Sequence, residues 1–383
     1  MLYRPFGRTG QEVSVLGFGC MRLPVLDGQG DRIDEPLATE MLRYAIDQGV
    51  NYVDTAYPYH STSHGVPGQS EPFVGRALRG GLRDRVLLAT KLPSWLIQTR
   101  ADMDRFLAEQ LRRLQTDHID CYLLHGLNGG SWDHLREAGV IEFIEHAKTA
   151  GRIRFAGFSF HGEPEHFAPI VDGYDFDFCQ IQYNYMDTEY QAGRAGLHHA
   201  AGKGLGVVVM EPLRGGSLVR RVPSEVQEIW DRAPVRRSPA EWGLRFVWDD
   251  PGVSLVLSGM GAMEQVVENI RSAATAAPRS LLPAELEAIA QATDAYRARC
   301  RVDCTGCGYC MPCPSGVNIP GVFEKLNDVY FYEDPQMSRL AYGMQFAAGG
   351  KASDCVECGE CEDECPQHIA IREALKEAVR ILE

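Results

Sequence analysis

Apolar, β-branched runs alternate with amphipathic segments through most of the chain. The runs share a mostly apolar character and occupy residues 13–19, 51–56, 86–91, 118–125, 154–160, 178–184, 206–212 and 254–260. Between them, apolar residues recur every three or four positions, which predicts helices over residues 38–49, 102–116, 140–151, 239–250 and 263–274. Strands separated by helices run parallel, so this order favours a closed (β/α)8 TIM barrel over residues 1–283.

An open, doubly wound sheet is the alternative arrangement of the same elements. Such a sheet normally carries a Gly-x-Gly-x-x-Gly turn after its first strand, where the glycines let the chain approach a dinucleotide phosphate. Residues 17–23 read GFGCMRL and lack the third glycine. Because the usual nucleotide fingerprint is missing, the closed barrel is the better prediction.

The composition narrows the class of protein. With 383 residues, of which 45% are hydrophobic, the chain is long enough for one large domain and a smaller one. A formal charge of -14 argues against nucleic-acid or anionic-membrane binding, because both need clustered Lys and Arg. No apolar run reaches the roughly 18 residues of a membrane span, and residues 1–10 lack a secretory signal core. We therefore expect a cytoplasmic protein with small-molecule or protein partners, and neither nucleic acid nor membrane.

The cysteines fall into two groups. Cys20, Cys121 and Cys179 stand alone in predicted strands, where small buried apolar side chains are expected. The other nine lie between Cys300 and Cys365, and in a reducing compartment such crowding indicates metal or cluster ligands rather than disulfides. The pattern predicts a small, mainly helical, ferredoxin-like iron–sulfur domain over residues 284–383, with helices within residues 320–332 and 338–350.

The cysteine spacing predicts two [4Fe–4S] clusters. The second array has intervals of two, two and three residues and then a proline, which is typical of bacterial ferredoxins, whereas the first array has two residues before its last cysteine. Zinc would favour two separated pairs. Because two-cluster ferredoxins exchange their fourth ligands, the expected sets are Cys304, Cys307, Cys310 and Cys365 for one cluster and Cys355, Cys358, Cys361 and Cys313 for the other. Cys300 is spare, or replaces a neighbour if the shorter spacing fails.

Acidic residues crowd the second array. They are Asp354, Glu357, Glu360, Glu362, Asp363 and Glu364. A solvated face is the ordinary interpretation, and a docking surface for a redox protein, such as a ferredoxin or another carrier with a basic face, is the alternative.

Four ionisable residues are expected at one end of the barrel, because catalytic groups of such barrels lie at the C-terminal strand ends. Three consecutive predicted strands end at Asp54, Lys91 and His125, and Tyr59 follows Asp54 by five residues. A free phenol is a poor proton donor near neutral pH, so we expect Lys91 to lower the Tyr59 pKa and Asp54 to keep Lys91 charged. His125 would hydrogen-bond a substrate oxygen and stabilise negative charge that develops there.

These residues lie in segments that resemble the aldo-keto reductase family. The segments are GRTGQEVSVLGFGCMRL at residues 7–23, DTAYPY at 54–59, ATKLP at 89–93, YLLHG at 122–126 and VLSGMGAMEQVVENI at 256–270. The resemblance implies the (β/α)8 barrel, reduction of a carbonyl or oxidation of an alcohol, and a catalytic tetrad of Asp54, Tyr59, Lys91 and His125. The cysteine arrays extend the resemblance to a subgroup of the family with ferredoxin-like C-terminal domains.

The same resemblance implies NAD(P)H in an extended pose over the barrel mouth. Ser159 and Gln180 match the family's carboxamide contacts, whereas Phe160 replaces its Asn and Met210 its stacking Tyr. The expected cofactor-binding set is Ser159, Gln180, Met210, Leu213, Arg214, Gly215, Gly259, Gln265, Glu268 and Asn269.

The phosphate-binding positions of this set leave the cofactor open. Gly259 and Gln265 stand where the family often places Lys and Arg for the 2′-phosphate, so a preference for NADPH over NADH is not implied. Residues 213–217, which include Arg214, suit the diphosphate of a nicotinamide cofactor or the phosphate of a flavin.

Three functions are compatible with this combination. Clusters pass single electrons and a nicotinamide gives a hydride, so coupling them requires a group such as a flavin, or a substrate that accepts single electrons. The leading hypothesis is an oxidoreductase whose clusters pass electrons to or from the barrel. The alternatives are an NAD(P)H-dependent carbonyl reductase with purely structural clusters and a redox-sensing interaction subunit with little turnover. Residues 60–71 and 126–139, with Trp95 and Trp132, are candidates for the pocket wall.

Overall fold

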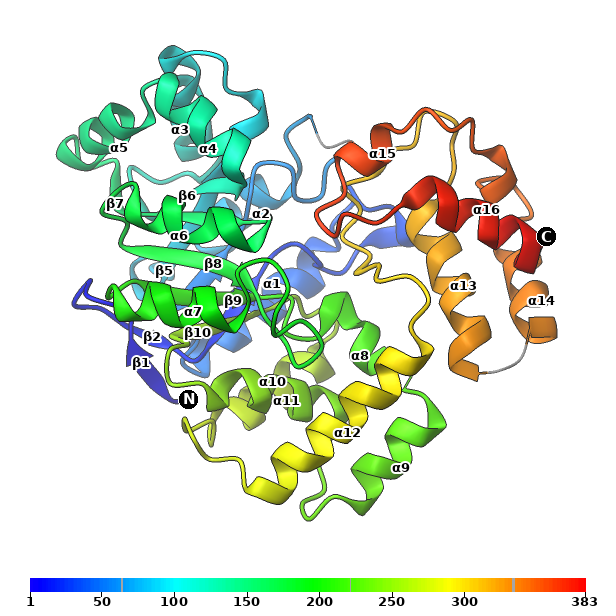
Figure 1. Ribbon diagram of the computed structural model, residues 1–383. Coiled ribbons are helices and arrows are strands. Elements are labelled where there is room, and N and C mark those ends of the chain that lie inside the picture. The colour runs from blue at the N-terminus through cyan, green and yellow to red at the C-terminus, as the bar shows by residue number, and fades with distance from the viewer. Residues whose placement is uncertain (63–64, 221, 333–334) are drawn as a thin grey trace. The chain divides into compact units, whose positions relative to one another are not determined.

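The computed structural model describes residues 1–383 except 63–64, 221 and 333–334, so part of the expected pocket wall at 60–71 lies outside the described residues (Figure 1). The chain forms two compact units. The first comprises Met1–Pro212 and Leu244–Ser280, and the second comprises Leu213–Gly243 and Leu281–Glu383. The boundary predicted at residue 283 stays a prediction, and residues 213–243 associate with the C-terminal part of the chain.

The first unit is built around a closed barrel of parallel strands, which confirms the predicted fold (Figure 1). In barrel order the described strands are β3 (Leu16–Gly19), β4 (Tyr52–Asp54), β5 (Leu87–Leu92), β6 (Ile119–Leu127), β7 (Ile153–Phe160), β8 (Phe178–Gln182), β9 (Gly206–Met210) and β10 (Leu255–Ser258), and β10 pairs with β3 to close the ring. Each lies within one of the predicted apolar runs, except that β5, β6 and β7 extend slightly beyond theirs. The runs are continuous because parallel strands are buried on both faces.

Helices lie outside the barrel strands that they connect (Figure 1). They are α1 (Glu35–Asp47), α2 (Ser70–Ala77), α3 (Arg100–Leu114), α4 (Gly129–Glu137), α5 (Val140–Thr149), α6 (Pro164–Asp172), α7 (Gly193–Gly202), α11 (Met263–Ala273) and, across the boundary of the two units, α10 (Pro239–Asp249). Short 3-10 turns occur at Leu26–Gly28, Arg83–Arg85 and Ser94–Leu96. Helix α1 begins earlier than the apolar period predicted, because the Asp34 side chain accepts a hydrogen bond from the Leu37 amide and caps its first turn.

An antiparallel hairpin of β1 (Tyr3–Pro5) and β2 (Glu12–Ser14) precedes the barrel and was not predicted. Phe6, in the hairpin turn, is completely buried against the first residues of barrel strands. A Cβ atom added to Gly206 would lie 2.4 Å from the Phe6 ring, so glycine is required where β9 begins. Cys20, Cys121 and Cys179 are also completely buried in this unit, which confirms their predicted packing role.

The second unit is helical and confirms the predicted character of the C-terminal region. Its helices are α8 (Ser217–Arg220), α9 (Ser224–Arg232), α12 (Pro283–Arg299), α13 (Ile319–Tyr332), α14 (Pro335–Gln345), α15 (Glu360–Asp363) and α16 (Ile371–Leu382), with 3-10 turns at Arg214–Gly216 and Ala352–Asp354. The predicted second helix ends at Gln345 rather than at residue 350, where Gly349 and Gly350 both have positive φ. None of the described helices has the length and apolar character to cross a membrane.

The buried Arg4 guanidinium joins the N-terminal hairpin to the end of the barrel. It donates hydrogen bonds to the carbonyls of Val253 at 2.8 Å, Trp248 at 2.5 Å and Ala276 at 3.0 Å. We expect Arg4→Met to lower the free energy of unfolding by about 3 kcal/mol, because buried acceptors lose charge-assisted donors. Urea denaturation followed by tryptophan fluorescence measures this loss.

The matched control for this substitution is Arg32→Met, because Arg32 forms an exposed ion pair with Asp27. We expect its effect to stay below about 1 kcal/mol. Equal urea midpoints for the two variants would contradict the anchoring role of Arg4.

Candidate active site and cluster sites

The barrel brings the four predicted catalytic residues together at the C-terminal ends of β4, β5 and β6. Lys91 Nζ donates to both carboxylate oxygens of Asp54 at 2.7 Å and to the Thr55 carbonyl at 2.9 Å. It also donates to Tyr59 Oη at 3.3 Å. The ring of His125 lies edge-on to the Tyr59 ring, with centroids 6.3 Å apart. All four side chains are buried, so a bound carbonyl would meet the phenol and the imidazole away from bulk water.

Burial dominates the electrostatics of this tetrad. It raises the pKa of Asp54 and lowers the pKa of Lys91, and the charge of each opposes the shift of the other. The pKa of Tyr59 lies well above its usual value, first because of burial and then because of the Asp54 charge. The expected lowering of the Tyr59 pKa by Lys91 is therefore wrong for this structure. Lys91 is already neutralised by Asp54, and the charge that lowers the Tyr59 pKa is that of Arg22.

A buried polar network behind Lys91 was not predicted from the sequence. Gln110 of α3 donates to the Lys91 carbonyl at 2.9 Å and to Glu71 Oε1 at 2.8 Å, and its own side-chain carbonyl accepts from Tyr122 Oη at 2.7 Å. Arg113 Nε donates to Glu71 Oε2 at 2.8 Å. Gln110 and Glu71 are fully buried, so the network fixes the end of β5. The sequence signal that could have indicated this network is Gln110, a polar residue at an apolar position of the helix predicted over residues 102–116.

The four cysteines predicted to share the first cluster line one pocket in the second unit. They are Cys304, Cys307, Cys310 and Cys365, and Ile319, Phe323 and Ile371 complete the lining. Burial, followed by the charges of these neighbouring thiolates, raises the pKa of Cys310. The residues therefore fit a cubane, whose four iron corners each take one thiolate.

The second predicted set is grouped more loosely. Burial, with contributions from Cys313 and Cys355, raises the pKa of Cys361 to about 11, and Cys358 is exposed. Among the described residues, no three His, Cys, Asp or Glu side chains converge as ligands of a single metal ion would. Thiolates of a cluster bind different corners and surround a volume instead.

The two cysteine arrays repeat one backbone conformation. In each, the third and fifth residues have positive φ, at Gly306 and Gly308 and again at Glu357 and Gly359. The amide two residues after the first cysteine donates to its sulfur at 3.4 Å in both arrays. The third residue after each final cysteine also has positive φ and donates to that cysteine's carbonyl, at Gly316 and at His368. Because the conformations match, the second array is shaped like the first.

Several of the acidic residues around the second array have partners within the same unit. Glu357 pairs with Lys376 at 2.9 Å and Glu362 with Arg372 at 2.7 Å. Asp354 accepts hydrogen bonds from two backbone amides. These contacts support the interpretation as a structured, solvated face, and docking of a redox protein there stays a prediction.

Comparison with known proteins agrees with this arrangement. Residues 15–280 match the aldo/keto reductase family model, and residues 303–370 match a 4Fe-4S dicluster domain. The chain belongs to the aldo-keto reductase family. It is 26% identical to the uncharacterized oxidoreductase YqkF of Bacillus subtilis over 78% of this chain and 99% of that relative, and 27% identical to L-galactose dehydrogenase of Arabidopsis thaliana over 70% and 86%. The holo form of aldo-keto reductase AKR11C1 from Bacillus halodurans superposes with a TM-score of 0.61 at 29% identity, covering 76% of this chain and 96% of that one.

Two of the residues expected at the carboxamide end of a nicotinamide-cofactor site, Ser159 and Gln180, lie on β7 and β8. Ser159 Oγ accepts from the Gly126 amide at 2.8 Å, and Gln180 Nε2 donates to the Met210 sulfur at 3.4 Å. Gln180 Oε1 is buried and has no hydrogen-bond partner among the described residues. A nicotinamide carboxamide would supply the missing donor, so this end fits the group. Phe160 packs against Phe167 instead of offering an amide.

The adenine end of that cofactor site is changed. A Cβ atom on Gly259 would lie 3.2 Å from the Arg22 side chain, so glycine here makes room for an arginine from the β3 end. Gln265 Oε1 accepts from the Gly261 amide, and Asn269 donates to Ser258 Oγ at 3.0 Å, next to Glu268 on α11. Residue 259 thus lacks the cationic side chain that the family often places there, and the Arg22 side chain lies beside it instead. Sequence spacing does not reveal this neighbour.

The two tryptophans predicted to line the pocket differ in position. The Trp95 ring centroid lies 5.1 Å from that of His125, so Trp95 borders the catalytic residues. Trp132 is buried against Phe176, with centroids 5.7 Å apart. These contacts support the packing interpretation of Trp132, and a role of either tryptophan in the pocket wall stays a prediction.

The position of Cys365 in the pocket lining predicts which of the two clusters depends on this cysteine. We expect Cys365→Ala to remove the cluster held by the first array, because Cys365 lines that pocket, and to leave the other cluster in place. Cys313→Ala should do the opposite. Iron and acid-labile sulfide counts after anaerobic reconstitution, with EPR of the reduced protein, measure both effects.

Cys300→Ser is the matched control, since Cys300 does not line the pocket. It should keep the full iron content. If Cys365→Ala instead removes the signal that depends on Cys355, Cys358 and Cys361, each array supplies its own fourth ligand and the exchange is wrong.

Proposed function

We propose that this aldo-keto reductase interconverts a small-molecule carbonyl and its alcohol, and that two [4Fe–4S] clusters pass electrons to or from the barrel mouth. The observation that carries the proposal is the buried tetrad, in which Lys91 touches both Asp54 and Tyr59. The match of the C-terminal region to a dicluster domain supports the electron path.

The tetrad supports proton transfer at a substrate oxygen. In the reductive direction the carbonyl takes up two electrons and two protons, and Tyr59 Oη supplies the proton for the oxygen. The carbon would receive its hydrogen as a hydride from a bound flavin or nicotinamide, or, in a substrate reduced through a radical, as a proton from solvent. Lys91 donates a hydrogen bond to Tyr59 Oη and so positions the phenol, and Asp54 holds Lys91 in place. His125 donates a hydrogen bond to the same oxygen as negative charge develops. In the oxidative direction Tyr59 accepts the alcohol proton.

The connectivity of the chain supports coupling between the two parts. Strand β9 ends at Met210, and the second unit begins at Leu213, three residues later. Clusters supply single electrons, so two successive transfers are needed for each carbonyl reduced. A bound flavin, or a substrate that is stable as a radical, would hold the first electron. A redox protein outside the chain, such as a ferredoxin, would exchange electrons with the clusters.

A second candidate function is NAD(P)H-dependent carbonyl reduction with clusters that only stabilise the C-terminal unit. The observation that favours it is the buried, unpartnered Gln180 Oε1. When bound there, the nicotinamide would supply the hydride. Gln180 and Ser159 would orient its carboxamide, and the tetrad would supply the proton as before.

The proton-donor role of Tyr59 gives a direct test. We expect Tyr59→Phe to lower the rate of carbonyl reduction by about 100-fold or more, because the general acid is lost while the fold is kept. Since the pKa of Tyr59 is raised, its acid form persists well above neutrality, and wild-type reduction should be flat between about pH 6 and 9. Steady-state rates with a panel of aldehydes and ketones across pH measure both.

Tyr57→Phe is the control for that substitution. Tyr57 is also buried in the loop after β4 but packs edge-on against Phe106. It should retain activity within about twofold. Full activity in Tyr59→Phe would discard the assigned proton donor.

The electron path can be separated from hydride transfer. We expect anaerobic wild-type protein, reduced by a low-potential one-electron dye without nicotinamide, to reduce a carbonyl substrate. Cys358→Ala should lose this dye-driven turnover, because the exposed second array would lose its cluster. Any NAD(P)H-driven rate should persist. If dye-driven turnover is the same in Cys358→Ala, or if only NAD(P)H supports turnover, the clusters are structural.

A further inference from the structure

Residues 213–243, which follow β9, contact α12 in the second unit. The Tyr296 hydroxyl on α12 donates to the Leu218 carbonyl at 3.0 Å, and Arg299 pairs with Glu225 of α9 at 3.0 Å. Arg237 forms an ion pair with the buried Glu285. These contacts explain why residues 213–243 belong to the same compact unit as the cysteine arrays.

Arg214 is the member of this segment that reaches the first array. Its side chain is only 8% exposed, and its Nη2 atom lies 3.0 Å from Asp303 Oδ1. Its Nη1 atom approaches the Cys300 sulfur at 4.0 Å, and that thiol donates to Asp303 Oδ1 at 3.3 Å. Asp303 immediately precedes Cys304, the first residue of the array. The guanidinium therefore fixes the point at which the chain enters the cluster pocket.

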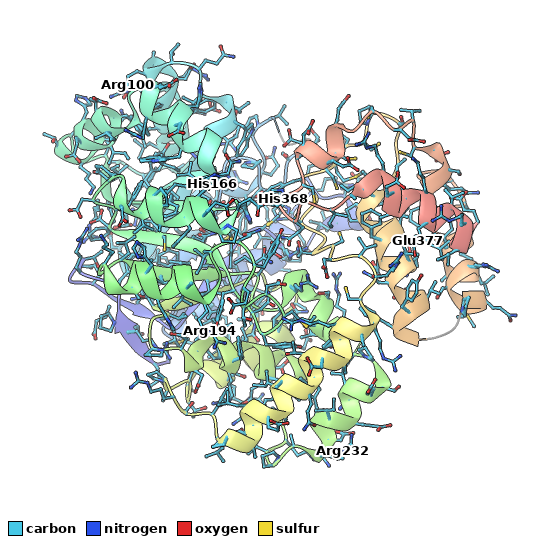
Figure 2. All side chains as sticks on the ribbon, viewed as in Figure 1. Arg100, His166, Arg194, Arg232, His368 and Glu377 are labelled. Atoms are coloured by element: carbon cyan, nitrogen blue, oxygen red, sulfur yellow. The ribbon has the colours of Figure 1, made fainter. Side chains whose placement is uncertain are left out.

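Residues 300–303, which lead into the first array, make further hydrogen bonds. Asn327 Oδ1 accepts hydrogen bonds from the Arg301 and Val302 amides at 3.0 and 2.8 Å, and Asn327 Nδ2 donates to the Val302 carbonyl at 2.8 Å. The Arg301 guanidinium binds both oxygens of Glu377 on α16 at 2.6 Å (Figure 2). Every residue from Cys300 to Asp303 thus has a side-chain or backbone anchor, and Arg214 is the one that arrives from the loop after β9.

We propose that Arg214 is a positioning residue for the cluster of the first array, and not a ligand of a cofactor phosphate as the family resemblance implies. The Arg214 side chain is buried and its guanidinium is already paired with Asp303, so it would have to break this pair and leave its buried site to reach a phosphate. A cluster with four thiolates carries net negative charge. Arg214 offsets the charge of Asp303 beside it and favours the reduced, more negative state. This inference rests on iron at the first array and not on electron transfer to the barrel.

The experiment compares Arg214→Gln, Asp303→Asn and the double variant in the full chain after anaerobic reconstitution. We expect each single variant to lose iron from the first array. Where the cluster is retained, Arg214→Gln should lower the midpoint of one of two EPR signals in a redox titration, and Asp303→Asn should raise it. The double variant should be no worse than the more affected single variant, because the two side chains act as one pair. Arg214→Lys should restore part of the iron content by keeping the charge.

NADPH and NADH affinities, measured by quenching of tryptophan fluorescence, distinguish the two roles of Arg214. We expect the Kd in Arg214→Gln to stay within about twofold of wild type. Arg220→Gln is the control, because Arg220 is an exposed side chain of the same segment that contacts the Gly215 carbonyl. It should change neither cluster.

Two results would overturn the proposal. One is a Kd for NADPH raised by about tenfold in Arg214→Gln with both cluster signals unchanged, which would return Arg214 to the phosphate. The other is a wild-type protein without iron at the first array. The iron count separates this second result from a failed electron path, in which iron is present but dye-driven turnover is absent.

Discussion

The buried ion pair of Lys91 and Asp54 is the constraint on which the active-site end of the barrel depends. Taking two charges out of water costs several kcal/mol per ion, so such a pair persists only when its remaining donors are satisfied. Here the ammonium has both carboxylate oxygens at 2.7 Å and the Thr55 carbonyl at 2.9 Å. Pairing of β4 with β5 sets these distances, and Gln110 holds the Lys91 backbone from behind. The position of the Tyr59 phenol follows from this arrangement.

The barrel was predictable because its signal is local. Each strand is a continuous apolar run, and each predicted helix has its own period, so order alone implied the closed topology. The hairpin of β1 and β2 and the association of residues 213–243 with α12 were not predictable. They depend on contacts such as that of Tyr296 with the Leu218 carbonyl, 78 residues apart in the chain. No periodicity within either segment encodes such a contact.

The site residues, too, could be predicted where the signal lies in the local sequence, and were missed where it depends on contacts between distant residues. Asp54, Lys91 and His125 were found because strand ends of one barrel must converge, and the cysteines because their spacing is itself the pattern. Glu71 and Gln110 were missed because each resembles an ordinary helical residue. Arg22 was missed because its role arises from the absent side chain of Gly259, at the opposite end of the barrel sequence. The pKa of Tyr59 was given the wrong direction because burial, which sequence does not show, outweighs the neighbouring charge.

The two cysteine arrays have the same backbone but different means of holding it. The first array places Gly306 and Gly316 at left-handed positions, where glycine is unstrained, whereas the second has Glu357 and His368 there. A non-glycine residue in that region costs about 1 kcal/mol. The ion pair of Glu357 with Lys376 of α16 holds this residue of the second array in place. Gly306 at the same position of the first array is unstrained and needs no such contact. If both arrays hold clusters, their surroundings would differ in charge, because the Glu357–Lys376 pair lies at the second array where the first has Gly306, and surrounding charge is one factor that sets the reduction potential of a cluster.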